Sequence, residues 1–336
     1  MGNYGDIENK GWEISLNTHP LIGAFEWDSD FQISFNRNKL RALDGTANAQ
    51  IVGYGQWSDV VSVTNVGESL YNFYGYVCDG VYEDLEDLQT SAKPAKYPAD
   101  GVFNRTNTVW VGDIKYKDLN GDGVIDENDR TNIGSPLPKF TFGWTNTFRY
   151  KNFDLSLFIN GSYGNKVFNY LGMKLTHMNS PWSNQLNTVL DRAQIVPIDP
   201  NKDYSAGVVV NGVTIYNWYD DITNVRVANA GATIPRASIQ DPNDNDRISD
   251  RYIEDGSYIR LKNITLGYTF PGKIIKKWGL DNLRVYANIQ NLLTITGYSG
   301  YDPEIGASTA SANVYGLDNG RYPSPTVYSF GLNVSF

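Results

Sequence analysis

The amino-acid sequence predicts an all-β fold, namely a portion of an antiparallel transmembrane β-barrel with long loops. Three observations support this fold class: apolar and polar residues alternate with a period of two, several alternating segments reach ten or more residues, and long irregular stretches separate some of them while tight turns separate others. A tilted strand needs about 9–11 residues to cross the hydrocarbon layer, whereas globular strands average about 5–6. Short turns on one side and long loops on the other are typical of outer-membrane barrels.

The first four alternating segments lie in the N-terminal half. In 12–17, Trp12, Ile14 and Leu16 alternate with polar residues, and the same period continues through 25–35. Because successive side chains of a strand point to opposite faces, each segment is expected to have one apolar face. The segments 140–150 and 153–160 are separated by a very short turn, which predicts a hairpin.

Three more segments follow at 257–270, 283–293 and 328–336, and we expect about eight to ten long strands in all. In 257–270 the apolar residues change parity near Asn263, which predicts a change of face there. The last segment ends on the aromatic residue Phe336. Such an apolar strand would be an aggregation-prone edge in a soluble sandwich, but in a closed barrel it pairs with a neighbour.

The composition excludes several classes of protein. The 336-residue chain has a formal net charge of -9, which argues against a nucleic-acid partner because such proteins need a basic surface. Cys78 is the only cysteine and there are two histidines, so an intrachain disulfide and a Cys/His metal site are excluded. No apolar run is long enough for a transmembrane helix.

Alternation alone is equally typical of a soluble β-protein, so the alternative is a surface-exposed or soluble β-rich module that binds glycans. Its ligand would stack on aromatic side chains in loops. The residues expected in or beside loops are Trp57, Trp110, Trp182 and Trp218. Each of these tryptophans is also explained as an interfacial residue of a membrane barrel.

A hydrolase is the third functional hypothesis. Asp28 and Asp30 lie two apart on a strand, and Glu83 and Asp87 share a face if their segment is helical. Paired carboxylates serve glycosidases, but they are common on any acidic surface. A catalytic triad would require His19 or His177, each of which is expected to be an ordinary surface residue. The sequence therefore predicts that the protein is not an enzyme.

The segment 118–129, DLNGDGVIDEND, matches the template of a calcium-binding loop. That template has oxygen ligands at positions 1, 3, 5, 7, 9 and 12 and a glycine at position 6, which is Gly123 here. A turn rich in Asn, Asp and Gly also forms without an ion. The flanks are not helical, so we expect a structural Ca²⁺ site without an EF-hand fold. The expected ligands are Asp118, Asn120, Asp122, the carbonyl of Val124, Asp126 and Asp129.

Several segments together resemble the C-terminal part of the SusC/RagA family of TonB-dependent outer-membrane transporters of Bacteroidetes. They occur in the family's order and span nearly the whole chain. They are DIENKGWEISLN (6–17), VGESLYNFYGYVCDGVYEDLEDL (66–88), the segment 112–165 from GDIKYKDLNGDG to INGSYGN, RYIEDGSYIRLKNITLGYTFP (251–271), LRVYANIQNLLTITGYSGYDPEIG (283–306) and YPSPTVYSFGLNVSF (322–336).

The resemblance implies a barrel of about 22 strands with a plug inside it, located as a multi-pass protein in the Gram-negative outer membrane. It implies import of oligosaccharides or peptides, a SusD-like lipoprotein that covers the extracellular mouth, and TonB acting through the plug. The substrate itself does not follow from the sequence. A terminal aromatic such as Phe336 resembles the signal by which outer-membrane strands are recognised for assembly.

The plug and the first half of the family's barrel have no counterpart in these segments, so we expect a C-terminal fragment. All of 1–336 is expected to be one part of the barrel, without a separate domain and with long loops at about 86–112 and 164–255. Eight to ten strands cannot close the family's barrel. The chain alone is therefore not expected to transport.

Overall fold

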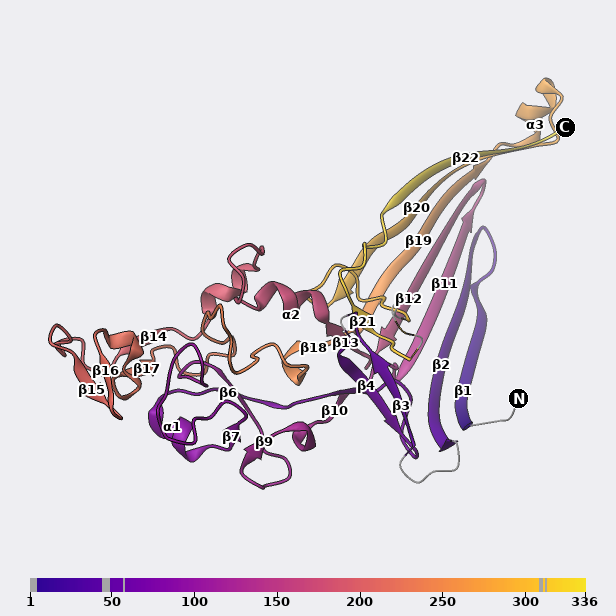
Figure 1. The fold of residues 1–336 in the computed structure, drawn as a ribbon. Coiled ribbons are helices and arrows are strands. Elements are labelled where there is room, and N and C mark those ends of the chain that lie inside the picture. The colour runs from indigo at the N-terminus through magenta and orange to yellow at the C-terminus, as the bar shows by residue number, and fades with distance from the viewer. Residues whose placement is uncertain (1–4, 44–48, 57, 308–310, 312) are drawn as a thin grey trace.

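The computed structural model describes residues 5–43, 49–56, 58–307, 311 and 313–336. A long curved sheet extends away from a cluster of loops that carries shorter sheets (Figure 1). This sheet has seven strands in the order β1-β2-β11-β12-β19-β20-β22, and all its neighbouring strands are antiparallel. Its strands are β1 (Gly5–Leu21), β2 (Phe25–Leu43), β11 (Phe140–Tyr150), β12 (Phe153–Tyr163), β19 (Tyr258–Thr269), β20 (Asn282–Thr296) and β22 (Val327–Ser335).

The predicted all-β, antiparallel fold is confirmed, and the seven alternating segments are the seven strands of the long sheet. The predicted number of eight to ten was too high for the described residues. The strands β3 and β4, which follow β2 in the sequence, are only 5 and 6 residues long. They pair with each other in a separate small sheet and do not join the long one. That four-stranded sheet consists of β10 (Thr131–Gly134), β5 (Phe73–Gly75), β4 (Val60–Asn65) and β3 (Gln50–Tyr54).

The register places most of the apolar side chains of all seven strands on one side, which we call the apolar face. Directly opposed residues of antiparallel strands share a face. One row of opposed residues runs across six strands: Leu16, Phe31, Trp144, Ile159, Leu261 and Leu293. A second row is Trp27, Phe148, Leu155, Leu266, Ala287 and Phe330.

The other side, the polar face, carries hydrophilic side chains in the same register. One of its rows is Asp28, Thr147, Ser156, Thr265, Asn288 and Ser329. The predicted change of face near Asn263 does not occur. In β19 the register shifts between Leu261 and Asn263, so Lys262 forms a bulge. An extra residue in one strand reverses the alternation, and it keeps Leu261 and Ile264 on the same face.

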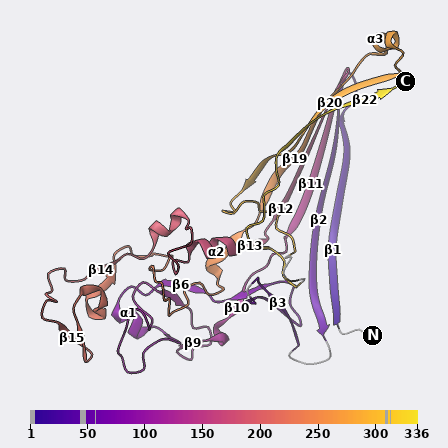
Figure 2. The same cartoon turned by 45° about the horizontal axis from the view of Figure 1, so that its top comes forward.

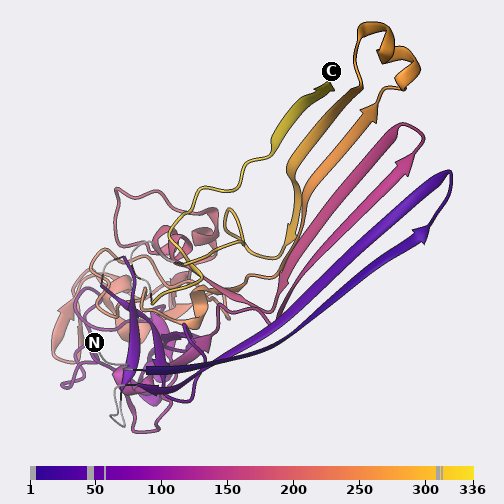
Figure 3. The same ribbon diagram turned by 90° about the vertical axis from the view of Figure 1, so that its right-hand side faces the viewer.

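Tight turns and long connections lie at opposite ends of the sheet. Figure 3 shows the hairpins β1–β2, β11–β12 and β19–β20 closing at the end far from the loops. The third of these turns carries α3 (Gly272–Ile275) and a short 3-10 segment, η6 (Lys276–Trp278). We call this side the turn end and the other side the loop end. No helix in the described part of the chain is long and apolar enough to cross a membrane.

The loop end consists of the connections 44–139, 164–257 and 297–326, and Figure 2 shows them gathered beside the sheet. The loop predicted at 86–112 is thus the middle of a longer connection. The remaining strands pair in small groups: β18 (Ile253–Asp255), β13 (Lys166–Asn169) and β21 (Leu317–Asp318); β14 (Ile195–Pro197) and β17 (Val225–Val227); β15 (Val208–Val210) and β16 (Val213–Ile215); β6 (Cys78–Val81) and β8 (Ile114–Tyr116); β7 (Lys93–Pro94) and β9 (Val124–Ile125).

Two hydrophobic cores hold the connections together. The larger core joins Leu88, Trp110 and Ile125 of the first connection to residues such as Val225 of the second. The smaller one includes residues from all three, for example Phe73, Phe168 and Leu317. The helices α1 (Leu85–Thr90) and α2 (Tyr170–Thr176) pack against these cores, as do the 3-10 segments η3 (Trp218–Asp220), η4 (Ile222–Asn224) and η5 (Asp250–Tyr252). The other two 3-10 segments of the loop end are η1 (Glu127–Asp129) and η2 (Asn187–Asp191).

Candidate functional site

The predicted calcium loop is a series of tight turns closed by its own carboxylates. Asp118 accepts hydrogen bonds from the backbone N–H groups of Gly121 and Gly123, at 2.6 and 2.8 Å. Both glycines have positive φ, at 76° and 83°, which an L side chain rarely adopts. Asp122 Oδ1 accepts from the N–H of Val124 at 2.9 Å. These hydrogen bonds fold the first part of the loop, which holds the first predicted ligands, into tight turns.

The second half of the loop is closed by Asp129, which is fully buried. Its two carboxylate oxygens accept from the backbone N–H groups of Leu119 and Asp126, each at 2.8 Å. In the described residues, the loop carboxylates are not among the groups of three that bring ligand atoms within 4.8 Å of one another. All six predicted ligands thus lie in one compact loop, and calcium binding there stays a prediction.

A different group does meet that distance: His177, Asp241 and Asp246 in the second connection. The imidazole Nε2 lies 2.7 Å from Asp241 Oδ2, and Nδ1 lies 3.0 Å from Asp246 Oδ2. Burial opposes the charge of His177, but the two carboxylates outweigh it and raise its pKa to about 9. With the proton bound, both ring nitrogens are donors to the two carboxylates. In this protonation state the three side chains form an ion-pair cluster.

The polar face of the long sheet carries ion pairs near the turn end. Arg149 lies 2.5 Å from Asp28, and Asp28 also contacts His19 at 2.6 Å. On strands β12 and β20 of the same face, Arg284 Nη2 lies 2.5 Å from Asp154 Oδ2.

The Asp154–Arg284 pair reaches from β12 to β20 across β19 between them. The residue of β19 at this point is Gly267, and a Cβ added there would collide with both side chains. The glycine thus leaves room for charged groups to connect alternate strands over the polar face.

At the loop end of the same face, Arg260 anchors the third connection. This side chain is 2 % exposed. Its guanidinium contacts Asp302 at 2.5 Å and Glu304 at 2.8 Å, and Nε donates to Thr294 at 2.8 Å. A buried arginine with several acceptors fixes geometry because each lost partner leaves a buried charge. The segment around 302–304 is therefore held against the polar face of the sheet.

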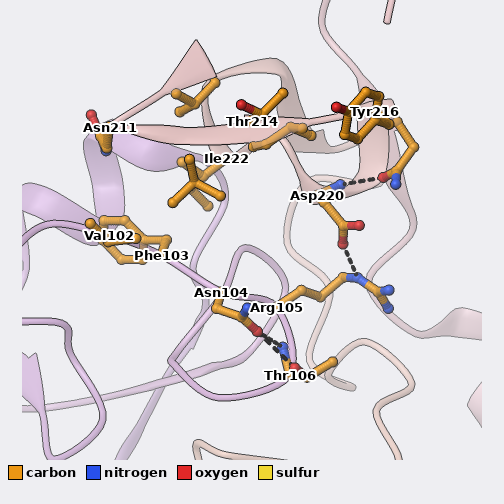
Figure 4. Close-up of a pocket in the computed structure, with 14 residues that line it drawn as sticks. Val102, Phe103, Asn104, Arg105, Thr106, Asn211, Thr214, Tyr216, Asp220 and Ile222 are labelled. Atoms are coloured by element: carbon orange, nitrogen blue, oxygen red, sulfur yellow. Dashed lines mark hydrogen bonds and ion pairs between the residues drawn. The ribbon is translucent and has the colours of Figure 1, made fainter. Parts of the chain in front are cut away.

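A pocket of about 330 Å³ lies in the loops, between the segment 102–106 and the region 210–222 (Figure 4). Arg105 Nε donates to Asp220 Oδ1 at 3.0 Å, and its guanidinium lies 5.1 Å from the ring centre of Tyr219. Val102 and Ile222 supply apolar wall on the other side. The pocket thus combines a charged pair with an apolar surface, and no sequence motif pointed to it.

The tryptophans predicted as ligand-stacking residues have different environments. Trp110 is 1 % exposed and belongs to the larger loop core, and Trp218 packs against the same core. Trp182 is 92 % exposed in the second connection. Trp57 lies outside the described residues. Of the described candidates, Trp182 has the ring surface free for stacking.

The carboxylate pairs considered for hydrolysis have cationic partners. Asp28 is paired with Arg149 and His19, and Asp87 lies 2.9 Å from Lys115. A general acid must hold a proton near neutral pH, which burial away from cations favours. Neither pair has that environment.

Comparison with known proteins shows relatives along the whole chain, although no family model matches. TonB-dependent receptor P3 of Formosa agariphila is 33% identical over 342 residues, which covers 99% of this chain and 29% of the relative. TonB-dependent receptor SusC of Bacteroides thetaiotaomicron is 26% identical, covering 99% of this chain and 27% of the relative. The chain thus spans about 30% of the length of the receptors it matches.

Solved structures agree with this relationship. A chain of the RagAB peptide transporter matches with a TM-score of 0.63 at 19% identity, over 99% of this chain and 30% of that one. The RagAB peptide importer in its closed-closed state gives 0.62 with the same coverage. The relatives are receptors and transport proteins, not enzymes. Along 99% of its length the chain is therefore similar in sequence to one part of TonB-dependent receptors, SusC among them, and its fold matches part of a chain of the RagAB transporter.

Proposed function

We propose that this chain forms part of the wall of an outer-membrane transporter that imports oligosaccharides or peptides. The observation that carries the proposal is the register of the long sheet, which separates an apolar face from a polar face over all seven strands. In an outer-membrane barrel the apolar face contacts lipid and the polar face lines the lumen. The ion pairs on the polar face would then border the path of the substrate.

The exposure of the apolar face favours this function over a soluble glycan-binding module. A soluble protein would have to cover these side chains, because large exposed apolar patches promote association. Phe330 and Leu332 are 84% and 60% exposed. On the central hairpin, Phe140, Phe142, Leu155 and Leu157 are all at least partly exposed.

The proposed partners follow from the relatives and from the loops. One relative is the receptor SusC, and the structural matches include the RagAB peptide transporter. We therefore infer a SusD-like lipoprotein that docks on the connections 44–139 and 164–257. Energy would come from TonB through a plug domain of the receptor. In the described residues the sheet has two free edges, so this part alone is not proposed to transport.

Matched substitutions on the two faces test the membrane placement. Leu157 lies on the apolar face and its neighbour Ser156 on the polar face of β12. In the intact receptor, Leu157→Arg should lower the stability in bilayers by about 2–4 kcal/mol, because a charge would enter the hydrocarbon. Ser156→Arg should have little effect. Resistance of the barrel to unfolding in SDS without heating measures both. Equal effects of the two variants, or release of the receptor from membranes by salt, would contradict the proposal.

An uptake assay tests transport and the substrate class. Cells that carry the intact receptor and its neighbouring lipoprotein should accumulate labelled oligosaccharide or labelled peptide. A proton uncoupler should abolish accumulation without abolishing surface binding, since TonB depends on the proton gradient. Binding that never leads to uptake would instead favour the glycan-binding module.

A further inference from the structure

The turn end of the long sheet is cationic, although the chain as a whole is acidic. The turns 22–24, 151–152 and 270–281 contain four lysines, Lys151, Lys273, Lys276 and Lys277, and a single acidic residue, Asp281. The net charge of the whole chain is -9, so the negative charge lies elsewhere. The four lysines are exposed. The lysine ion pairs among the described residues all involve other lysines.

Three of these lysines are presented by one folded turn between β19 and β20. Ile275 is its buried anchor, and the N–H of Leu280 donates to the Ile275 carbonyl at 3.3 Å. Gly279 ends the helical segment with a positive φ of 72°. The N–H of Asp281 donates to the Ser335 carbonyl at 2.8 Å, which fastens the turn to the last strand. The turn that carries these lysines, with α3, therefore has a defined place at the end of the sheet (Figures 1 and 3).

The same turn exposes apolar side chains beside the lysines. Ile274 and Trp278 are 46% and 64% exposed. On the neighbouring hairpin, Lys151 Nζ lies 5.1 Å from the ring centre of Tyr150, which is itself exposed. Tryptophan, tyrosine and lysine together at the end of a membrane-spanning strand are typical of the interface between hydrocarbon and headgroups. A turn held clear of any membrane has no such reason to expose apolar residues.

We propose that this basic turn, residues 270–281, binds the headgroups of anionic phospholipids in the periplasmic leaflet of the outer membrane. The inference rests on the proposed function, because tight turns of such barrels face the periplasm. Lysine ammonium groups attract anionic headgroups, and the apolar side chains enter the adjoining acyl region. The acidic loop end would then face outward.

Lipid-binding measurements on the intact receptor test this inference. The receptor is purified in detergent, and native mass spectrometry gives its affinity for the first phosphatidylglycerol and the first phosphatidylcholine bound. The wild type should prefer phosphatidylglycerol. The test variant is K273Q/K276Q/K277Q, which should bind phosphatidylglycerol about fivefold more weakly or worse, with phosphatidylcholine unchanged. The control variant is K39Q/K96Q/K117Q, which removes the same charge from exposed lysines at the loop end and should bind as the wild type does.

The outcomes separate the two proposals. An unchanged preference for phosphatidylglycerol in the test variant, or an equal loss in the control, overturns the lipid site. That result leaves the barrel intact, and it would assign the basic turn to a protein partner or to no partner. Failure of the wild-type receptor to float with lipid vesicles instead overturns the membrane placement itself. Flotation of both lysine variants shows that they fold and insert, so a loss of lipid preference cannot be attributed to misfolding.

Discussion

Two polar residues interrupt the apolar face, and two tryptophans compensate for them. Ser29 and Asn146 are opposed in β2 and β11, and both are buried. The indole N–H of Trp27 donates to Asn146 Oδ1 at 2.9 Å, and that of Trp144 donates to Ser29 Oγ at 2.9 Å. In hydrocarbon an unpaired N–H group is costly. The tryptophans thus cover the polar atoms and also satisfy their own donors.

Removing one partner of these tryptophan hydrogen bonds should destabilise the barrel modestly. Asn146→Ala leaves the Trp27 indole without an acceptor, and side-chain hydrogen bonds in membranes contribute about 0.6–1.7 kcal/mol. A double-mutant cycle with Trp27→Phe measures the coupling from denaturant unfolding in lipid vesicles. If the two losses add, the bond contributes nothing.

The His177 cluster makes the loop end sensitive to alkaline pH. Its pKa is raised from 6.5 to about 9 in the folded protein. A raised pKa means that the folded state binds the proton more tightly, so the stabilisation is complete below pH 6.5 and is lost as the pH rises through about 9. A shift of this size corresponds to about 3 kcal/mol.

This pH dependence can be measured by limited proteolysis of α2 and of the segment 241–246 across that window. Burial disfavours the charge of Asp246, but its bonds to His177 outweigh burial and lower its pKa to about 2, so the carboxylate stays charged throughout. The wild type should become more susceptible as the pH rises. His177→Gln should be susceptible at every pH, and a parallel rise in that variant would assign the effect to other groups.

At the scale of elements, the loop 118–129 is the place where a metal ion would act. If calcium binds, it should order the connection that contributes Ile125 to the larger core. Chelation should then increase proteolysis within 118–129, and calcium should restore protection better than magnesium, since the larger ion accepts more oxygen ligands. Asp122→Ala should remove the response to calcium. Glu127→Ala is the matched control, because Glu127 is not a predicted ligand. Protection that ignores calcium would show that the turns suffice.

The sequence predicted the strands better than their exact register. Alternation located both strands of the hairpin 140–163 because most side chains there are apolar or polar by position, with Asn146 and Phe158 as exceptions. In β19 the same rule predicted a change of face, since periodicity cannot distinguish a twist of the chain from an extra residue. The bulge at Lys262 is defined by the pairing of β19 with β12, where Leu261 and Asn263 face consecutive residues, and a single strand's pattern does not contain this pairing.

The candidate sites likewise differ in whether the sequence predicted them. The segment 118–129 was recognisable because its residues are contiguous. The pocket beside Arg105 and the His177 cluster join side chains 115 and 64 residues apart in the sequence. Such groups follow from how the loops fold over one another, and no local pattern specifies that. Trp110 illustrates the same point, since a tryptophan in a loop was expected at the surface and lies in a core.

At the scale of the whole molecule, the long sheet has two unpaired edges. Within the described residues β1 and β22 each have a single neighbour in the sheet. Open strand edges are not tolerated in hydrocarbon. The chain expressed alone should therefore aggregate or fail to show the heat-dependent mobility of a barrel on SDS gels. The intact receptor should show that mobility. A stable monomeric barrel formed by this chain alone would mean that the sheet closes on itself.

The shared cores at the loop end have a consequence for how such receptors diversify. Phe73, Phe168 and Leu317 come from three different connections and pack in one cluster. Exchanging a single connection for that of a relative would break this packing, even if the new segment brought better contacts for a nutrient. New specificities should therefore arise by coordinated replacement of all three connections, inherited as one block, while the strands beneath them stay the same.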